Sequence, residues 1–202
     1  MTARIQRNFT FTSGVHFNNQ FYTNCYDLDI TFMVESELIH DQNTAMDRIK
    51  YYITECLDSS TFINQSDTVA VDNYSSAGMR VCTLPEEPYD QIVGIMLMTK
   101  LNAISEGRLT IMDLSIESYM SDGVSCLHSA EENTGPFMLK GWWNSTQPDT
   151  NEIKAKNRKV VKLKKNKNDW DELGLGFTKV DDLSTFDSEN IVFASFDQKT
   201  EE

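Results

Sequence analysis

The sequence predicts a mixed helix-and-strand domain of the α+β class over residues 1–147, followed by an irregular C-terminal extension over residues 148–202. Apolar and polar residues alternate in two N-terminal stretches and again before residue 120, and apolar residues recur at helical spacing in between. Charge also divides the chain, because residues 154–167 hold 8 bases and no acid, whereas residues 168–202 hold 10 acids and 2 bases.

The N-terminal alternation predicts two half-buried strands, over residues 4–17 and 27–35. Asn18, Asn19 and Asn24 lie between them, and asparagine is typical of turns. We therefore expect the two strands to be joined by an asparagine-rich connection.

Two helices are expected further along. Residues 44–57 carry apolar side chains at close to helical spacing, with Asp47 in the first turn. A second and stronger helix runs from Pro88 to about Ile104 and ends at Gly107, since proline is tolerated in the first turn of a helix.

Alternation over residues 109–118 predicts a further strand, and residues 58–83 are ambiguous. Within that ambiguous stretch, residues 68–71 are a strand candidate and residues 73–78 a loop candidate. The adjacent indoles of Trp142 and Trp143 predict a last segment packed onto the domain, because two neighbouring indoles are rarely both left in water.

Composition excludes several classes of protein. The formal net charge of -13 argues against a nucleic-acid-binding surface over the whole molecule, because phosphate is bound mainly by Lys and Arg. The N-terminus lacks the apolar run of a secretory signal, and the longest apolar stretch, residues 92–101, is too short to span a membrane. The four cysteines are dispersed without a C-x-x-C pair, so we expect reduced thiols in a cytoplasmic protein.

The reactive residues carry little signal one at a time. His16, His40 and His128 are too far apart to form a local metal motif, and no phosphate-binding glycine loop or nucleophile elbow occurs. Asp27 and Asp29 share one face of a strand, where a carboxylate pair serves either proton transfer or simple solvation.

Five segments between residues 5 and 120 carry a resemblance when they are taken together. They are residues 11–16, which end in His16, residues 22–26, residues 57–64, residues 89–92 and residues 115–118. In order and spacing they resemble the tunnel-fold family of 6-pyruvoyl and 6-carboxy tetrahydropterin synthases. The first is similar to the family's phenylalanine-rich strand with a histidine, and the second occupies the position of its H-G-H sequence. The other three are similar to its L-D-H-x-x-L-N helix end, its T-x-E-N-L helix start and its V-x-E-T strand end.

This resemblance implies an antiparallel sheet with two helices on one face, and a homo-oligomer assembled through edge strands. The comparison with the family's motifs also shows that this chain lacks the family's residues at several zinc-binding and catalytic positions. The family binds zinc through three histidines, and only His16 stands at such a position, with Tyr22 and Asn24 at the other two. Ser59 replaces the catalytic histidine and Asn18 the cysteine nucleophile. We therefore expect a degenerate family member with no catalytic residues, no metal and no cofactor.

Glu117 stands at the family's substrate-anchoring glutamate. A carboxylate there can accept two N–H bonds from a pterin or purine, although an exposed structural role is an equal alternative. His16 and Asp90 complete the candidate ligand-binding set, Asp90 being also an ordinary acid in the first turn of a helix.

The extension offers a separate hypothesis. Its basic segment could contact phosphates of nucleic acid, or it could be a solvated linker paired with acidic parts of the chain. Phe193 and Phe196 lie among acids in the final stretch, whose composition resembles partner-recruiting acidic tails. The candidate contact residues of the basic segment are Lys154, Lys156, Arg158, Lys159, Lys162, Lys164, Lys165 and Lys167.

Three functional hypotheses follow. The leading one is a non-catalytic, oligomeric binding protein that acts through protein partners. The alternatives are a purine- or pterin-binding enzyme with an atypical active site, and an accessory factor for a nucleic-acid-processing complex that acts through the basic segment and the acidic tail.

Overall fold

A computed structural model describes residues 3–131, 134–148 and 169–178 of the chain. Its first element is a long antiparallel hairpin of β1 (Arg4–Phe17) and β2 (Gln20–Val34). Asn18 and Asn19 form the turn with φ values of 52° and 59°, a conformation that asparagine tolerates better than most residues. Asn24 was wrongly assigned to this connection, because it lies within β2 with its side chain buried.

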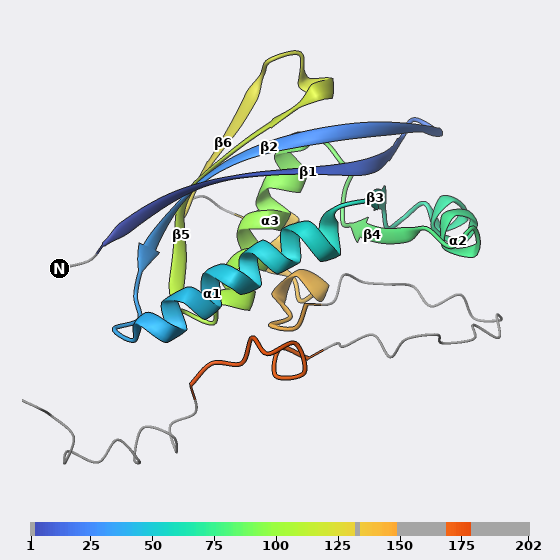
Figure 1. The fold of residues 1–202 in the computed structure, drawn as a ribbon. Coiled ribbons are helices and arrows are strands. Elements are labelled where there is room, and N and C mark those ends of the chain that lie inside the picture. Colours follow the sequence, from blue (N-terminus) through green and yellow to red (C-terminus); the bar gives the residue numbers. More distant parts are fainter. Residues whose placement is uncertain (1–2, 132–133, 149–168, 179–202) are drawn as a thin grey trace, which may run out of the picture.

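The hairpin is the centre of a six-stranded sheet with the order β4-β3-β1-β2-β5-β6 (Figure 1). On one side, β2, β5 and β6 continue the antiparallel pairing, so the predicted strand over residues 109–118 is confirmed. On the other side, β3 pairs parallel to β1, and β4 parallel to β3. The strands added to the hairpin are β3 (Ser60–Asn64), β4 (Arg80–Leu84), β5 (Leu109–Ser118) and β6 (Ser125–Ser129).

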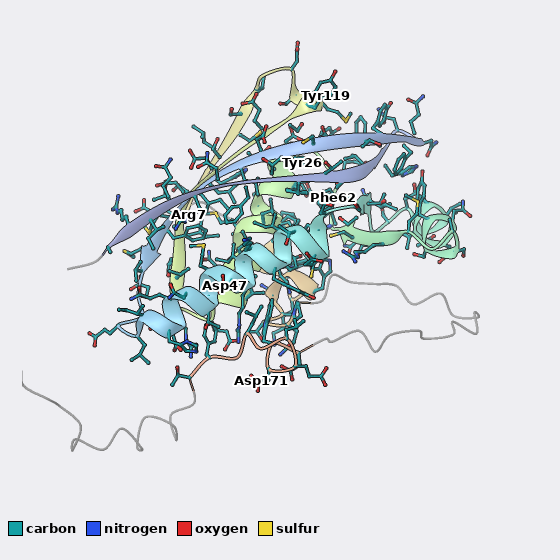
Figure 2. All side chains as sticks on the ribbon, viewed as in Figure 1. Arg7, Tyr26, Asp47, Phe62, Tyr119 and Asp171 are labelled. Atoms are coloured by element: carbon teal, nitrogen blue, oxygen red, sulfur yellow. The ribbon has the colours of Figure 1, made fainter. Side chains whose placement is uncertain are left out.

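Two helices pack on one face of this sheet, which confirms the predicted α+β class. They are α1 (Ile39–Tyr51), continued by a π-helical turn at Tyr52–Leu57, and α3 (Asp90–Ser105). Figure 2 shows Tyr26 and Phe62 between the sheet and these helices, and both side chains are fully buried. The first helix begins five residues earlier than predicted, with the carboxylate of Asp41 in its first turn.

A third helix, α2 (Thr68–Ser76), occupies the stretch for which the sequence favoured a strand and a loop, so that prediction is wrong. The carboxylate of Asp67 caps this helix by accepting from the backbone N–H of Ala70 at 2.9 Å. With β3 and β4 it forms a βαβ unit, the usual way to connect parallel strands. The helix buries a second, smaller cluster that includes Ile63 and Val81.

Side-chain alternation places α2 on the opposite face from α1 and α3. Phe62 and Cys82 of the paired strands β3 and β4 belong to the main core, whereas their neighbours Ile63 and Val81 belong to the α2 cluster. The sheet is therefore covered on both faces at its parallel end.

Residues 142–147 pack onto α3, as the two indoles predict. Trp143 is buried, and the indole of Trp142 donates to the backbone carbonyl of Thr83 in β4 at 2.8 Å. The fully buried ammonium of Lys100 donates to three backbone carbonyls of this segment, at 2.7 to 3.2 Å. These bonds satisfy a charge that would otherwise be costly to bury.

Residues 169–178, in orange-red, lie against α1 and are drawn below it in Figure 1. The indole of Trp170 is 2% exposed and donates to the carbonyl of Thr146. The guanidinium of Arg48 lies 3.6 Å from the ring centre of Phe177 and donates to the carbonyl of Leu175 at 2.7 Å. Within the described ranges, no helix is both long and apolar enough to cross a membrane.

Candidate functional site

The structure does not bring Glu117, His16 and Asp90 together. Glu117 lies on the exposed face of β5, away from α1 and α3. Asp90 begins α3 on the opposite face, where its carboxylate accepts from the hydroxyl of Ser118 at 2.7 Å. His16 lies near the end of β1, beside α2.

The three positions that the resemblance assigns to zinc ligands also diverge. In the β1–β2 pairing, Tyr22 lies opposite Val15 and shares its face with Asn24, whereas His16 lies opposite Phe21 on the other face. Their side chains therefore cannot meet at one ion. In the part of the chain that the structure describes, no three His, Cys, Asp or Glu side chains are grouped to hold a metal.

Ser59, at the resembled catalytic position, has a structural setting. Its φ is 61°, and its backbone N–H donates to the carbonyl of Thr12 at 2.7 Å. The carboxylate of Asp58 accepts from the backbone N–H of Thr12 at 2.9 Å. Ser59 and Asp58 therefore connect the start of β3 to β1 through hydrogen bonds with Thr12.

Asp90 sits in a half-buried polar group beneath the sheet. Burial raises the pKa of its carboxyl, and the hydrogen bond from Ser118 opposes that shift. Burial also raises the pKa of the neighbouring Tyr26 phenol far above its usual range. Asn24, buried nearby, accepts from the backbone N–H of Met120 at 3.1 Å. This group links β2, α3 and the β5–β6 connection.

Glu117 belongs to an open acidic face. It lies opposite Asp27 of β2, and its carboxylate accepts from the hydroxyl of Ser125 at 3.0 Å. Asp27 accepts in turn from the hydroxyl of Thr10 at 2.8 Å. Because side chains alternate along a strand, Asp29 shares this face with Asp27, as its sequence spacing predicts.

A pocket of about 370 Å³ lies at one end of the sheet, beside α2. Its lining is polar, with two carboxylates, three carboxamides and one imidazole. The lining residues are His16, Asn18, Asn19, Asn64, Asp67 and Glu87.

The parallel pairing explains why these residues converge. β1, β3 and β4 run in one direction, so their carboxyl ends meet at the same end of the sheet. The loops that follow these three strands supply Asn18, Asp67 and Glu87 respectively. Crevices at the carboxyl ends of parallel strands are common ligand sites in α/β sheets.

Hydrogen bonds hold the pocket walls. The amide of Asn64 donates to Glu87 at 3.0 Å, and its oxygen accepts from the backbone N–H of Ser66 at 3.0 Å. Nδ1 of His16 lies 3.5 Å from Oδ2 of Asp67, and the imidazole packs edge-on against Tyr74, with the ring centres 5.5 Å apart.

Sequence reasoning identified His16 in this pocket but missed Asn64, Asp67 and Glu87. Asp67 carried a usable signal, because an aspartate just before a helix is a preferred N-cap. Glu87 carried no such sequence signal, since its position in the pocket depends on the pairing of β4 with β3.

The remaining candidate residues lie outside the described ranges. They are Lys154, Lys156, Arg158, Lys159, Lys162, Lys164, Lys165, Lys167, Phe193 and Phe196.

No protein-family model matches the chain, and no curated protein sequence matches it. Among solved structures, it is similar to an uncharacterized protein from Wolinella succinogenes, with a TM-score of 0.48 and 10% identity over 65% of this chain and 99% of that one. It is also similar to two 6-pyruvoyltetrahydropterin synthases. The Plasmodium vivax enzyme, a catalytic-residue mutant, has a TM-score of 0.41 and 7% identity over 63% of this chain and 97% of that one. The Plasmodium falciparum enzyme has a TM-score of 0.37 and 11% identity over 63% and 96%.

Proposed function

We propose that this chain is a non-catalytic, oligomeric binding protein that acts through contacts with partners. The observation that carries the proposal is the divergence of His16 from Tyr22 and Asn24 across the two faces of the hairpin. A tetrahydropterin synthase needs zinc ligands that converge, and these positions do not. The proposal includes a cytoplasmic setting, in which the four separate thiols would stay reduced.

The two sheet edges support self-association through β6. The edge strand β4 receives a hydrogen bond from the indole of Trp142. Among the described residues, the opposite edge strand β6 has β5 as its single partner, and the β5–β6 hairpin exposes large apolar side chains. These are Tyr119, Met120, Val124 and Leu127, which are 86%, 45%, 62% and 74% exposed. An open edge strand beside apolar surface is a natural site for pairing with a second copy.

Metal analysis of the purified protein tests the non-catalytic part of the proposal. We expect zinc well below one ion per chain after dialysis against a weak chelator. Tightly bound zinc at one ion per chain would contradict the proposal, since it would mean that ligands converge in a way the hairpin geometry does not allow.

Light scattering tests the oligomeric part. We expect the wild type to be larger than a monomer at micromolar concentration, and Leu127→Lys to shift it toward the monomer. Leu139→Lys is a matched control, because Leu139 is also 74% exposed but belongs to neither strand of the β5–β6 hairpin. A monomeric wild type, or equal masses for the two variants, would overturn self-association through β6.

Binding of a purine or pterin at Glu117 is the second candidate. What favours it is the exposure of the Glu117 carboxylate on an open sheet face, where Ser125 orients one oxygen. Thermal unfolding with guanine nucleotides and pterins, in the wild type and in Glu117→Gln, tests this function. If the function is present, at least one of these compounds should raise the melting temperature of the wild type but not that of Glu117→Gln. If no compound raises the melting temperature of the wild type, this function is excluded.

Contact with nucleic acid through residues 154–167 is the third candidate. What favours it is the composition of that segment, which holds eight bases and no acid in fourteen residues. Deletion of residues 154–167 should abolish any salt-dependent binding of single-stranded DNA or RNA. Unchanged binding after the deletion would exclude this segment as the contact.

A further inference from the structure

We propose that the pocket at the carboxyl ends of β1, β3 and β4 binds a small organic cation, an ammonium or guanidinium group held between Asp67 and Glu87. The inference rests on the proposed function in treating the protein as a binding protein, and it names the class of ligand. The site lies within one protomer.

Charge is the first argument. Of the described residues, two carboxylates and no Lys or Arg side chain line the pocket. Among these lining residues the imidazole of His16 is the one basic group, and its Nδ1 lies 3.5 Å from Oδ2 of Asp67. An anion would meet two like charges here, whereas a cation would be attracted by both.

Remaining hydrogen-bond capacity is the second argument. Oδ1 of Asp67 accepts from the backbone N–H of Ala70, and Oε1 of Glu87 accepts from the amide of Asn64. A carboxylate has about four acceptor positions, so both groups can accept further bonds. No partner for Oε2 of Glu87 occurs among the hydrogen bonds and ion pairs of the described residues. Ammonium and guanidinium groups carry only donors, and they complement such a lining.

Preorganisation of the pocket-lining residues is the third argument, because hydrogen bonds and a tight turn hold them in place without a ligand. Asp67 is held as the N-cap of α2, and Asn64 is held between Glu87 and Ser66. A two-residue turn presents Asn18 and Asn19. Fixed acceptors lower the ordering cost of binding.

The pocket volume admits a small organic cation, and the kind of liganding groups narrows the class of ligand. A volume of about 370 Å³ lies within the range of small-molecule pockets and leaves ample room for such a cation. Calcium takes six to eight oxygen ligands, usually with several carboxylates, and this pocket offers two carboxylates that are already partly engaged. An ammonium or guanidinium group needs fewer coordinating oxygen atoms than calcium does.

Isothermal titration of the full-length protein tests the proposal, with n-butylammonium and n-butylguanidinium as probes. Butyrate and n-butanol are the anionic and neutral probes of matched size. We expect saturable binding of at least one cation and none of butyrate or butanol. Calcium chloride is a further arm, and saturable calcium binding without binding of either cation would overturn the proposal.

Two charge-removing variants place the binding in this pocket. Asp67→Asn keeps an oxygen to cap Ala70, and Glu87→Gln keeps an oxygen for Asn64, so both variants should fold. Each should weaken cation binding about tenfold or more, as expected for the loss of a charge-assisted hydrogen bond. Asp72→Asn on α2 and Glu86→Gln are matched controls, because both acids are exposed and neither lines the pocket.

The possible failures are distinguishable. Absence of saturable cation binding, or equal affinity in Asp67→Asn, Glu87→Gln and the controls, would overturn the pocket assignment and leave the zinc and mass measurements unaffected. Recovery of a chemically altered cation would instead contradict the non-catalytic function while leaving the site in place. Unchanged cation in the recovered sample supports both.

Discussion

The antiparallel and parallel halves of the sheet present their surfaces differently. In the antiparallel half, one face packs on α1 and α3, and the other exposes acids such as Asp27 and Glu117. In the parallel half, the main core covers one face of β3 and β4, and α2 covers the other. The loops of the parallel half form the pocket, so convergence of polar groups follows from strand direction.

The two halves also differ in how much apolar surface they bury. The main core draws buried residues from β1 to β5 and from both long helices. The α2 cluster consists of Ile63, Ala70, Val71 and Val81, with Tyr74 at its border. Since the hydrophobic contribution scales with buried apolar area, α2 should open at lower free energy than the main core.

The largest effect should come from Phe62→Ala. Phe62 lies in β3 but packs edge-on against Phe11 and Tyr26 of the hairpin, with ring centres 6.3 and 6.0 Å apart, so it joins the two halves. Removing a fully buried phenylalanine should lower the free energy of unfolding by about 3–5 kcal/mol. Urea unfolding measures it, with Val69→Ala as control because Val69 is 70% exposed. If Phe62→Ala lowered the free energy of unfolding by less than Val69→Ala does, the two halves would not be joined through Phe62.

Val81→Ala should have a smaller and more local effect. Val81 is 1% exposed in the α2 cluster, and loss of two methyl groups with partial collapse of the space should cost roughly 2 kcal/mol. Hydrogen exchange should show lost protection in α2 and β4 before β2 and β5 are affected. Uniform loss over all strands would contradict the difference between the halves.

The antiparallel half was predictable from sequence because its strands carry a local signal. One face of β2 is buried and the other solvated, so Leu28 and Ile30 alternate with Asp27 and Asp29. β3 has no such alternation, since Phe62 and Ile63 are both buried, on opposite faces. β-branched Thr68, Val69 and Val71 favoured a strand, and the capping of α2 by Asp67 overrode that preference.

The site was less predictable than the fold. His16 was identified by its resemblance to a zinc ligand, but its neighbours Asp67 and Glu87 come from loops that only the parallel pairing brings together. Asp90 and Glu117 were grouped with it, and the sheet separates those two by placing them on opposite faces. A one-residue difference along a strand reverses the direction of a side chain, which motif matching does not register.

The smallest effect concerns the half-buried carboxyl of Asp90, beneath the antiparallel half. Burial raises the pKa of Asp90, and the Ser118 hydroxyl opposes the rise. The folded protein therefore holds this proton more tightly than the unfolded chain, whose Asp pKa is about 3.9. The stability that Asp90 contributes is fully present below the unfolded pKa and is lost as pH rises through the folded pKa. Asp90→Asn should thus gain stability relative to the wild type as pH rises through that range.

Ser118→Ala sharpens the same point. It removes the hydrogen bond that favours the charged form, so the pKa of Asp90 should rise further, as followed by the NMR titration of the side-chain carboxyl. Ser115→Ala is the matched control, since Ser115 lies on the same strand but faces away from α3. An unchanged titration in Ser118→Ala would mean that this hydroxyl does not set the charge of Asp90, and that the buried polar group serves only to pack the antiparallel half.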